Sequence, residues 1–445
     1  MPGDLAGARL LITAQPRDDL GRTEGLRCRG PGPVRLPRRA VPVNREAPDI
    51  LSPEFAADPY AAYRVLRDDF PLLYHEATRS YVLSRYDDVE RAFKDPVFTT
   101  DNYDWQLEPV HGRTILQMSG REHAVRRALV APAFRGTTLE QQFLPVIERN
   151  ARQLIDEFRA SGGADLVAQF ATRFPVNVIV DMLGLDRADH ERFHRWYTAI
   201  IGFLGNLAQD PHVAEAGLRT REEFAAYLLP VIRERRDNLG DDLLSTLCAA
   251  EIDGTRMSDE DIKAFCSLLL TAGGETTDKA ISSLVHNLLR HPEQLAAVRA
   301  DHSLIAPAFA ETLRYTPPVH MIMRQAAEDV VIGGGKVPAG STVTCLIGAA
   351  GRDERRYADP DTFDIRRGDL SADTAFSAAA AHLSFALGRH FCVGALLAKA
   401  EVEVGVARLL EAMPDMALAP GAEPREQGVF TRGLDALPVE FTPAG

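Results

Sequence analysis

The residue best placed to do chemistry in this sequence is Cys392, which lies between Gly388 and Gly394 and directly before a run of strong helix formers, residues 395–402. The leucines of that run are spaced to bury one face, so we predict a helix that begins just after the cysteine. The dipole and the free N–H groups at a helix N-terminus favour a thiolate over a thiol. A lone cysteine without such a context is more often a small buried hydrophobic residue. The two glycines add the backbone freedom that a loop needs to approach a flat cofactor closely.

The loop spacing Phe-x-x-Gly-x-x-x-Cys-x-Gly, at Phe385, Gly388, Cys392 and Gly394, resembles the haem-binding loop of the cytochrome P450 family. The resemblance implies that Cys392 is the axial ligand of haem b (iron protoporphyrin IX). In that family the cysteine thiolate pushes electron density onto the iron and favours O–O cleavage. The usual family loop has a second glycine where this chain has Ala386, and this change removes no ligand.

A second segment that could do chemistry lies in a predicted long core helix over residues 257–290. Ser258 and Asp261 have capping-box spacing, and residues 264–270 are almost uniformly apolar. The middle of the helix reads Ala-Gly-Gly-Glu-Thr-Thr at 272–277. Two glycines inside a helix cost roughly 1 kcal/mol each relative to alanine, and buried polar groups add to this, so we interpret the segment as functional. The hydroxyl of Thr276 can also bond to the carbonyl four residues back and bend or open the helix; a tolerated kink is the alternative.

This segment resembles the Ala/Gly-Gly-x-Asp/Glu-Thr motif of the helix that crosses the distal face of the haem in the cytochrome P450 family. By that resemblance Glu275 and Thr276 are the catalytic residues, an acid and an alcohol that relay protons. Gly273 leaves room over the iron and is counted with the cofactor-binding residues.

Glu311 and Arg314 stand at i and i+3 on one face of a predicted helix, where they can pair. Such a pair is common on solvated helices and carries little information alone. It resembles the family's Glu-x-x-Arg motif, in which the pair joins a further arginine and has a structural role. We expect that arginine within residues 350–353 or 363–367, which resemble family stretches.

A haem carries two propionates, and charge-assisted hydrogen bonds from Arg and His are the strong way to bind them. His123 and Arg127 lie one helical turn apart and resemble the family's His-x-x-x-Arg helix. Residues 318–324 resemble the strand whose arginine, here Arg324, reaches a propionate, and His390 stands two residues before the cysteine. Each could be a surface charge, but four at family spacing predict a propionate site.

The expected substrate pocket is almost entirely apolar, which favours a bulky lipophilic small molecule such as a terpenoid, steroid or polyketide. By resemblance its wall comprises Trp105, Ile115, Leu116, Phe203, Leu269, Met321, Ile322, Met323, Val429 and Phe430. Tyr103, Leu204, Val319 and Thr431 belong to the same segments.

The elements that must position these residues are mainly helical. We predict helices over 139–161, 165–183 and 222–239, a hairpin at 72–75 and 80–84, and further strands between 320 and 347. The fold class is therefore mainly α with minor β-sheets, and the resemblance implies the cytochrome P450 fold over a single large domain, residues 46–445. Residues 1–45 hold nine Arg, six Pro and six Gly with little periodicity, which predicts a disordered or dispensable extension.

Composition excludes several other classes of protein. Five cysteines, odd in number and without CxxC spacing, argue against a disulfide framework and a zinc site and favour a reducing, cytoplasmic setting. A net charge of -13 argues against nucleic acid as a partner. No run approaches the roughly 20 apolar residues of a membrane span, so we expect no membrane anchor.

The sequence thus predicts a haem-thiolate monooxygenase that inserts one oxygen atom of dioxygen into its substrate. No GxGxxG fingerprint follows a predicted strand, so the electrons must come from separate proteins; the resemblance implies a ferredoxin or flavodoxin with a reductase. A peroxide-driven haem enzyme is one alternative, and Glu275 with Thr276 argues against it. A haem-binding sensor or carrier is another, and the same acid and alcohol argue against that too.

Overall fold

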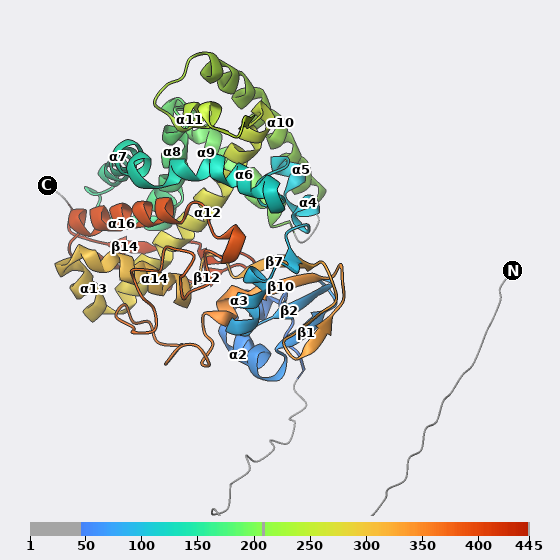
Figure 1. Ribbon diagram of the computed structural model, residues 1–445. Coiled ribbons are helices and arrows are strands. Elements are labelled where there is room, and N and C mark those ends of the chain that lie inside the picture. The colour runs from blue at the N-terminus through green and yellow to red at the C-terminus, as the bar shows by residue number, and fades with distance from the viewer. Residues whose placement is uncertain (1–45, 207–209, 444–445) are drawn as a thin grey trace, which may run out of the picture. The chain divides into compact units, whose positions relative to one another are not determined.

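The computed structural model describes residues 46–206 and 210–443 (Figure 1). The extension predicted over residues 1–45 lies outside the described residues. Helices make up most of the described chain and the sheets are small, so the predicted mainly α fold is confirmed. No helix in these ranges is both long and apolar enough to cross a membrane.

The chain order and bounds of the helices are α1 (Pro53–Ala57), α2 (Tyr60–Asp69), α3 (Tyr86–Lys94), α4 (Tyr103–Gln106), α5 (Glu108–His111), α6 (Gly120–Val130), α7 (Leu144–Asp156), α8 (Arg173–Met182), α9 (His190–Leu204), α10 (Pro211–Asp237), α11 (Leu243–Ala249), α12 (Asp259–Arg290), α13 (Pro292–Ala300), α14 (Ile305–Tyr315), α15 (Ile347–Ala350) and α16 (Ala395–Ala412). Two π-helical segments, η2 (Thr138–Phe143) and η3 (Val167–Ala171), precede α7 and α8.

The strands are β1 (Leu72–His75), β2 (Ser80–Leu83), β3 (Phe98–Thr99), β4 (Gly163–Asp165), β5 (Glu251–Ile252), β6 (Thr255–Arg256), β7 (Met321–Ala326), β8 (Val330–Ile332), β9 (Gly335–Val337), β10 (Thr342–Leu346), β11 (Ala417–Leu418), β12 (Glu426–Gln427), β13 (Gly433–Leu434) and β14 (Pro438–Glu440). The largest sheet has the order β1-β2-β10-β7-β3 and contains the predicted hairpin as β1 and β2. Strand β10 runs parallel to β2 and antiparallel to β7, which fixes the segment before Arg324 against the rest of the sheet.

Helix α12 is the long core helix that the sequence predicts. Its start is stabilised by the predicted capping box, in which Ser258 and Asp261 bond to each other's backbone N–H. It contacts α8, α10, α14 and α16, and most of its residues between Ile262 and Leu288 are buried. A helix that is apolar on nearly all sides lies in the core. Helix α12 therefore holds the segment 272–277, in its middle, at a fixed place inside the protein.

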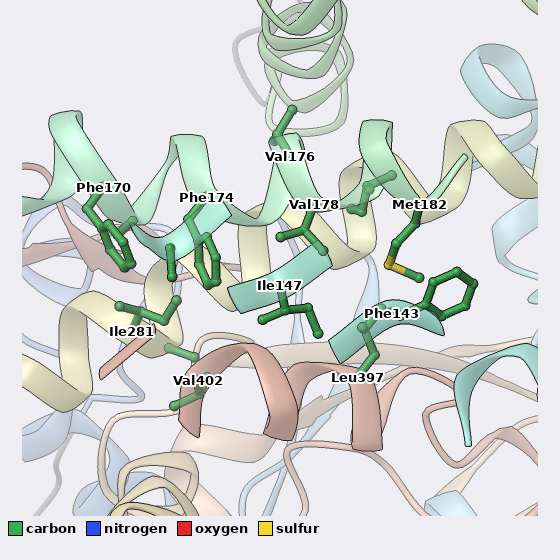
Figure 2. Packing of buried hydrophobic residues seen from close by; sticks show 14 of the residues in the cluster. Phe143, Ile147, Phe170, Phe174, Val176, Val178, Met182, Ile281, Leu397 and Val402 are labelled. Atoms are coloured by element: carbon green, nitrogen blue, oxygen red, sulfur yellow. The ribbon is translucent and has the colours of Figure 1, made fainter. Parts of the chain in front are cut away.

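The core between α8 and α16 is filled by apolar side chains from several elements (Figure 2). Phe174, Val178 and Met182 of α8 point toward α16, whose Val402 lies on the facing side, and Ile147 of α7 lies between them. Phe170 and Phe174 stack with ring centroids 5.0 Å apart. This packing fixes α16, and therefore the loop before it, relative to the central helices.

Three of the predicted helices have different bounds from those expected. Residues 139–161 are divided into η2 and α7, because Pro145 in the first turn of α7 has no N–H to continue a preceding helix. Residues 165–183 likewise begin with a strand residue, Asp165, and a π-helical segment. The predicted helix at 222–239 begins earlier, at Pro211, where Asp210 accepts a hydrogen bond from the His212 N–H.

Candidate active site

A cavity of about 330 Å³ separates the middle of α12 from the loop that carries Cys392. Its lining is mostly apolar and comes from α6, α12, α14, the segment before β7, the loop at 384–394 and the start of α16. Five of the predicted cofactor-binding residues border it, namely His123, Arg127, Gly273, His390 and Cys392. Segments distant in sequence therefore meet where the sequence predicts a haem.

The cysteine loop has an unusual backbone conformation. Gly388 has φ +68°, and a Cβ there would lie 2.7 Å from the carbonyl oxygen of Phe93, so a side chain is excluded. Ala386 has φ +53°, in the left-handed region that costs an L-residue roughly 1–2 kcal/mol. This conformation explains why a glycine suits that position and why an alanine is tolerated there only at a cost. The Cys392 N–H donates to the Phe385 carbonyl over 2.9 Å and closes the loop.

The electrostatics of Cys392 differ from the expectation for a helix N-terminus. Helix α16 begins at Ala395 with Gly394 as its N-cap, so the sulfur lies ahead of the helix. Burial raises the pKa of the Cys392 thiol, while the Gly394 N–H and the charge of Arg127 lower it. Desolvation is the largest of these effects, so the helix terminus alone does not hold a thiolate. An iron ion held by Cys392 would supply the missing charge, since a coordinating thiol is deprotonated outright.

Cationic and imidazole side chains gather at one edge of the cavity. The rings of His123 and His390 lie with centroids 4.2 Å apart, and Arg127 borders the same cavity. Burial, followed by the charges of His123, Arg324, Arg389 and Arg127, lowers the pKa of His390 to about 3. Burial and the charges of Arg127 and Arg389 lower the pKa of His123 as well.

These groups have no acidic partner in the part of the chain that the structure describes. Among the described residues, no carboxylate forms an ion pair with Arg127, Arg324, His123 or His390. Arg324 is 3% exposed, donates to the Met323 carbonyl over 2.8 Å and lies over the Phe93 ring at 4.9 Å. His123 and Arg324 are buried and Arg127 and His390 are half-buried, and such donors without an anion are costly unless a ligand completes the group. The donor set therefore fits the two carboxylates of a haem, and the nearby sulfur fits its iron.

In the segment 272–277 of α12, Thr276 makes the hydrogen bond that the sequence predicts, but the helix is not broken there. The Thr276 hydroxyl donates to the Ala272 carbonyl over 2.6 Å, yet α12 continues without interruption to Arg290. A Cβ on Gly273 would lie 3.0 Å from Ile179 Cδ1, and one on Gly274 would lie 3.1 Å from the Tyr197 ring. The two glycines therefore allow α8 and α9 to pack closely on α12, and Gly273 also borders the cavity.

Glu275 is held by two neighbours. Lys279 Nζ lies 2.8 Å from its Oε1, one turn along α12, and the Thr431 hydroxyl donates to the same oxygen over 2.6 Å. Thr431 belongs to the turn between β12 and β13, which also bridges to Val319 ahead of β7. The carboxylate is thus oriented by a segment far away in the sequence.

A second cavity, of about 270 Å³, adjoins the first along Thr276 and Ala272. Seven of the ten predicted pocket residues border one or both cavities: Ile115, Leu116, Leu269, Met321, Ile322, Met323 and Phe430. Tyr103, Leu204, Val319 and Thr431 also line the second cavity.

The other three predicted pocket residues border neither cavity. Trp105 is 64% exposed, because Tyr103 and Gln106, three residues apart on α4, take the inward face. Phe203 packs on α10, where a Cβ on Gly217 would lie 2.6 Å from it, and Ile201 and Leu204 face the cavity instead. Val429 packs with the cluster of the N-terminal helices.

The predicted structural pair is formed and has its third member. Arg314 donates to Glu311 through Nε and Nη2, both over 2.7 Å, and both side chains are at most 1% exposed. Arg367 Nε donates to the same carboxylate over 3.0 Å. Of the two segments where the sequence placed this arginine, 363–367 is therefore the one that supplies it.

Several polar residues at the cavities were not singled out from the sequence. Glu401 of α16 borders the first cavity, is buried, and has one unpartnered oxygen among the described residues; burial raises its pKa, and a bond from Thr277 opposes this. The sequence holds one signal for the burial of Glu401, because this residue lies one turn after Leu397 on the apolar face of the predicted helix. Gln106 and His111 border the second cavity, and their short helices carry no periodic pattern that would reveal them.

A family model described as "Cytochrome P450" matches residues 60–307 and 299–414. Pulcherriminic acid synthase of Bacillus subtilis (strain 168) is 41% identical over 394 residues, which are 88% of this chain and 97% of that protein. Cytochrome P450 monooxygenase PikC of Streptomyces venezuelae is 35% identical over 408 residues, 88% of this chain and 93% of that protein. The solved structure of CalO2 aligns with a TM-score of 0.80 at 30% identity, covering 90% of this chain and 100% of CalO2.

Proposed function

Since this chain belongs to the cytochrome P450 family and is a monooxygenase of that family, we propose that it holds haem b through the thiolate of Cys392 and oxidises a lipophilic small molecule. The observation that carries the proposal is the meeting, at one cavity, of the half-buried Cys392 with His123, Arg127 and His390, which lack an acidic partner among the described residues. A haem bound there supplies the activation of dioxygen, with one oxygen atom going into a C–H bond of the substrate and the other to water.

The roles proposed for the binding residues follow from charge and burial. Cys392 is the ligand for the iron, while His123, Arg127, Arg324 and His390 serve the two propionates through charge-assisted hydrogen bonds. Binding an anion beside these groups favours their protonated forms, because an opposite charge within a few ångströms offsets desolvation. The haem is thus expected to raise the pKa values of His123 and His390, which burial lowers.

The proposed proton path uses Thr276 and Glu275. The Thr276 side chain borders both cavities, and a rotation about χ1 turns its Oγ1 from the Ala272 carbonyl toward the cavity. There the hydroxyl can hold a water or donate a proton in a largely apolar space that bulk water does not reach reliably. Glu275, held by Lys279 and Thr431, is the acid that restores the proton.

The proposed substrate is a terpenoid, steroid or polyketide, because the walls of both cavities are mostly apolar. Two relatives support this class: 6-deoxyerythronolide B hydroxylase is 33% identical over 415 residues, and the structure of CYP109E1 in complex with testosterone aligns with a TM-score of 0.77 at 29% identity. The electrons are proposed to come from a ferredoxin or flavodoxin with its reductase, in the cytoplasm.

The first test replaces the proposed ligand. Cys392→Ser should abolish the long-wavelength absorption of the reduced carbon monoxide complex that is characteristic of thiolate ligation. Cys345→Ser is the matched control, because Cys345 is fully buried and borders neither cavity. A normal carbon monoxide spectrum in Cys392→Ser would show that another group binds the iron.

The second test removes the proposed proton donor. Thr276→Ala should leave substrate binding intact but divert the consumed electrons from product to hydrogen peroxide, while Thr276→Ser, which keeps a hydroxyl, should restore coupling. Product, peroxide and reduced cofactor are measured together with a surrogate redox system. Full coupling in Thr276→Ala would remove the hydroxyl from the proton path.

A further inference from the structure

Two hydroxyl groups belong to residues that lie where the two cavities meet, and the proposed reaction uses only one of them. Seven described residues border both cavities. Two of them carry a hydroxyl, namely Thr276, which belongs to the proposed proton path, and Tyr103, the first residue of α4. The other five are apolar: Leu116, Leu268, Ala272, Val319 and Ile322. The Tyr103 hydroxyl is therefore a polar group of the active site without an assigned role.

Arg324 lies beside the cysteine loop, on the face of β7 that borders the first cavity. Ile322 borders that cavity, and Arg324, two residues further along β7, lies on the same face of the strand. The guanidinium lies over the Phe93 ring at 4.9 Å, and the Phe93 carbonyl oxygen would lie 2.7 Å from a Cβ on Gly388. Arg324 and the cysteine loop therefore both pack against Phe93, which agrees with the effect of the Arg324 charge on the pKa of His390.

The Tyr103 hydroxyl accepts a hydrogen bond but donates none within the described chain. Burial raises the pKa of Tyr103, while the charge of Arg324 and a hydrogen bond from it lower that pKa. A guanidinium has donors and no acceptor, so the Tyr103 oxygen accepts and its own hydrogen remains free. Within residues 46–206 and 210–443 no group accepts that hydrogen, whereas the hydroxyls of Tyr86 and Tyr357 both donate to the Ala381 carbonyl over 2.7 Å.

The free hydrogen of Tyr103 is within reach of a ligand. The residue is half-buried and borders both cavities, and its oxygen is not among the unpartnered polar atoms that the described chain closes off. An anion suits this hydrogen best, because the charges that act on this edge of the first cavity, those of Arg324, Arg389 and Arg127, are positive. A carboxylate has two oxygens and can accept from a guanidinium and from a phenol together.

We propose that Tyr103 is a fifth residue that holds the haem propionates, with its hydroxyl donating to the carboxylate that Arg324 binds; this rests on the proposed function. The bond that the oxygen accepts from Arg324 polarises the O–H group and makes it a stronger donor. Tyr103 also belongs to the wall of the second cavity. A phenylalanine would serve that wall equally well, so the hydroxyl is there for the carboxylate.

Tyr103→Phe tests the proposal, because it removes the hydroxyl and keeps the ring. Transfer of haem from the full-length, haem-loaded protein to apomyoglobin should show an affinity lower by roughly tenfold, as expected for a hydrogen bond to a charged group. Tyr63→Phe is the matched control and should keep the wild-type haem affinity, because the Tyr63 hydroxyl bonds to His320 over 2.7 Å and neither residue borders either cavity. Unchanged haem affinity in Tyr103→Phe, the result expected if the hydroxyl serves a substrate instead, would overturn the proposal.

A second probe separates the hydrogen bond from the packing of the ring. Iron protoporphyrin IX dimethyl ester has the same macrocycle and iron, but both of its propionates are neutral esters. With this probe Tyr103→Phe should lower the affinity by only about threefold, because a hydrogen bond between neutral groups contributes less than one to a charged group. The same transfer to apomyoglobin measures it. Equal losses with both probes would overturn the proposal, since the variant would then act through packing.

The carbon monoxide spectrum of the reduced wild type reports on Cys392 independently of Tyr103. A thiolate spectrum together with unchanged haem affinity in Tyr103→Phe refutes the role of Tyr103 alone. The predicted loss of affinity in Tyr103→Phe, without a thiolate spectrum in the wild type, refutes the proposed ligation by Cys392 alone.

Discussion

Two groups of charged side chains lie inside this protein and differ in how fully they are paired. The first, which we call the paired cluster, consists of Glu311, Arg314 and Arg367. Arg314 donates to both oxygens of Glu311 and to the carbonyls of Gly351, Pro360 and Thr362 at 2.7 to 3.0 Å. The Asp364 N–H donates to Glu311 over 2.9 Å. Every charge has partners, so this cluster has no capacity left for a ligand.

The second group, the unpaired cluster, consists of His123, Arg127 and His390, which border the first cavity, and of Arg324, whose charge acts on His390. Burial, followed by the positive charges nearby, lowers the pKa of both histidines, and no described carboxylate offsets the charge of the cluster. Both clusters cost desolvation energy, but only the paired cluster recovers it within the chain. The comparison indicates that incomplete pairing in a buried site marks the place of a ligand, whereas complete pairing marks a structural element.

The largest expected effect comes from breaking the paired cluster. Glu311→Gln leaves Arg314 and Arg367 buried without a counter-charge, so we expect the free energy of unfolding to fall by about 3–5 kcal/mol. Denaturant unfolding measures it. Glu215→Gln is the control, since its pair with Arg219 is exposed and such pairs contribute roughly 0–1 kcal/mol. Equal losses in the two variants would contradict the distinction between buried and exposed pairs.

A smaller effect is expected at Asp278 of α12, which is intermediate between the two clusters. Among the described residues, the one hydrogen bond to its carboxylate comes from the Thr172 hydroxyl, over 2.9 Å. Burial raises the pKa of Asp278 to about 7 against the opposing charge of Lys279. The folded state then holds a proton that the unfolded state has lost above pH 4. Stability from this group is therefore complete at low pH and falls as the pH rises toward and past 7.

Asp278→Asn should remove that pH dependence. A rise of the Asp278 pKa to about 7 corresponds to at most roughly 4 kcal/mol, so the variant should gain stability relative to the wild type at pH 8 by up to that amount and much less at pH 5. Melting temperatures across this range provide the measurement. If the wild type and the variant change in parallel with pH, Asp278 is ionised throughout.

Removing a charge from the unpaired cluster should not lower the stability of the haem-free protein, in contrast to removing one from the paired cluster. Arg127→Met removes a cation that lacks a counter-charge within residues 46–206 and 210–443, so the stability of the haem-free protein should not fall. Haem affinity should weaken roughly tenfold to a hundredfold, the value of a charge-assisted hydrogen bond of about 1.5–3 kcal/mol. Transfer of haem to apomyoglobin measures the affinity. Arg121→Met, at an exposed position on the same helix, is the control. Loss of stability in the haem-free variant would place Arg127 among the structural charges.

The smallest effect is expected at Thr431, whose hydroxyl orients Glu275. Thr431→Val keeps the shape but removes one hydrogen bond, which should cost about 0.5–1.5 kcal/mol of stability and raise the peroxide fraction modestly. Thr431→Ser should behave as the wild type. A peroxide fraction equal to that of the wild type in Thr431→Val would show that Lys279 alone orients the acid.

The sequence by itself determined the features whose partners are close along the chain. Helical periodicity brings together Glu311 with Arg314 and Thr276 with Ala272, and the structure has both contacts. The capping box of α12 and the β1–β2 hairpin follow from the same short-range geometry. These contacts need only the local backbone conformation, which the residue types and their spacing specify.

Only the tertiary structure decided the features that depend on burial and on long-range packing. Arg367 lies 56 residues from Glu311 and Thr431 lies 156 residues from Glu275, and no local pattern relates such pairs. The inward facing of Gln106 and His111 in place of Trp105 depends on how α4 and α5 pack on the rest of the chain. Desolvation also depends on the whole fold, which sets the number of atoms around the Cys392 sulfur. Desolvation raises the pKa of Cys392, whereas the position before a helix predicted a lowered value.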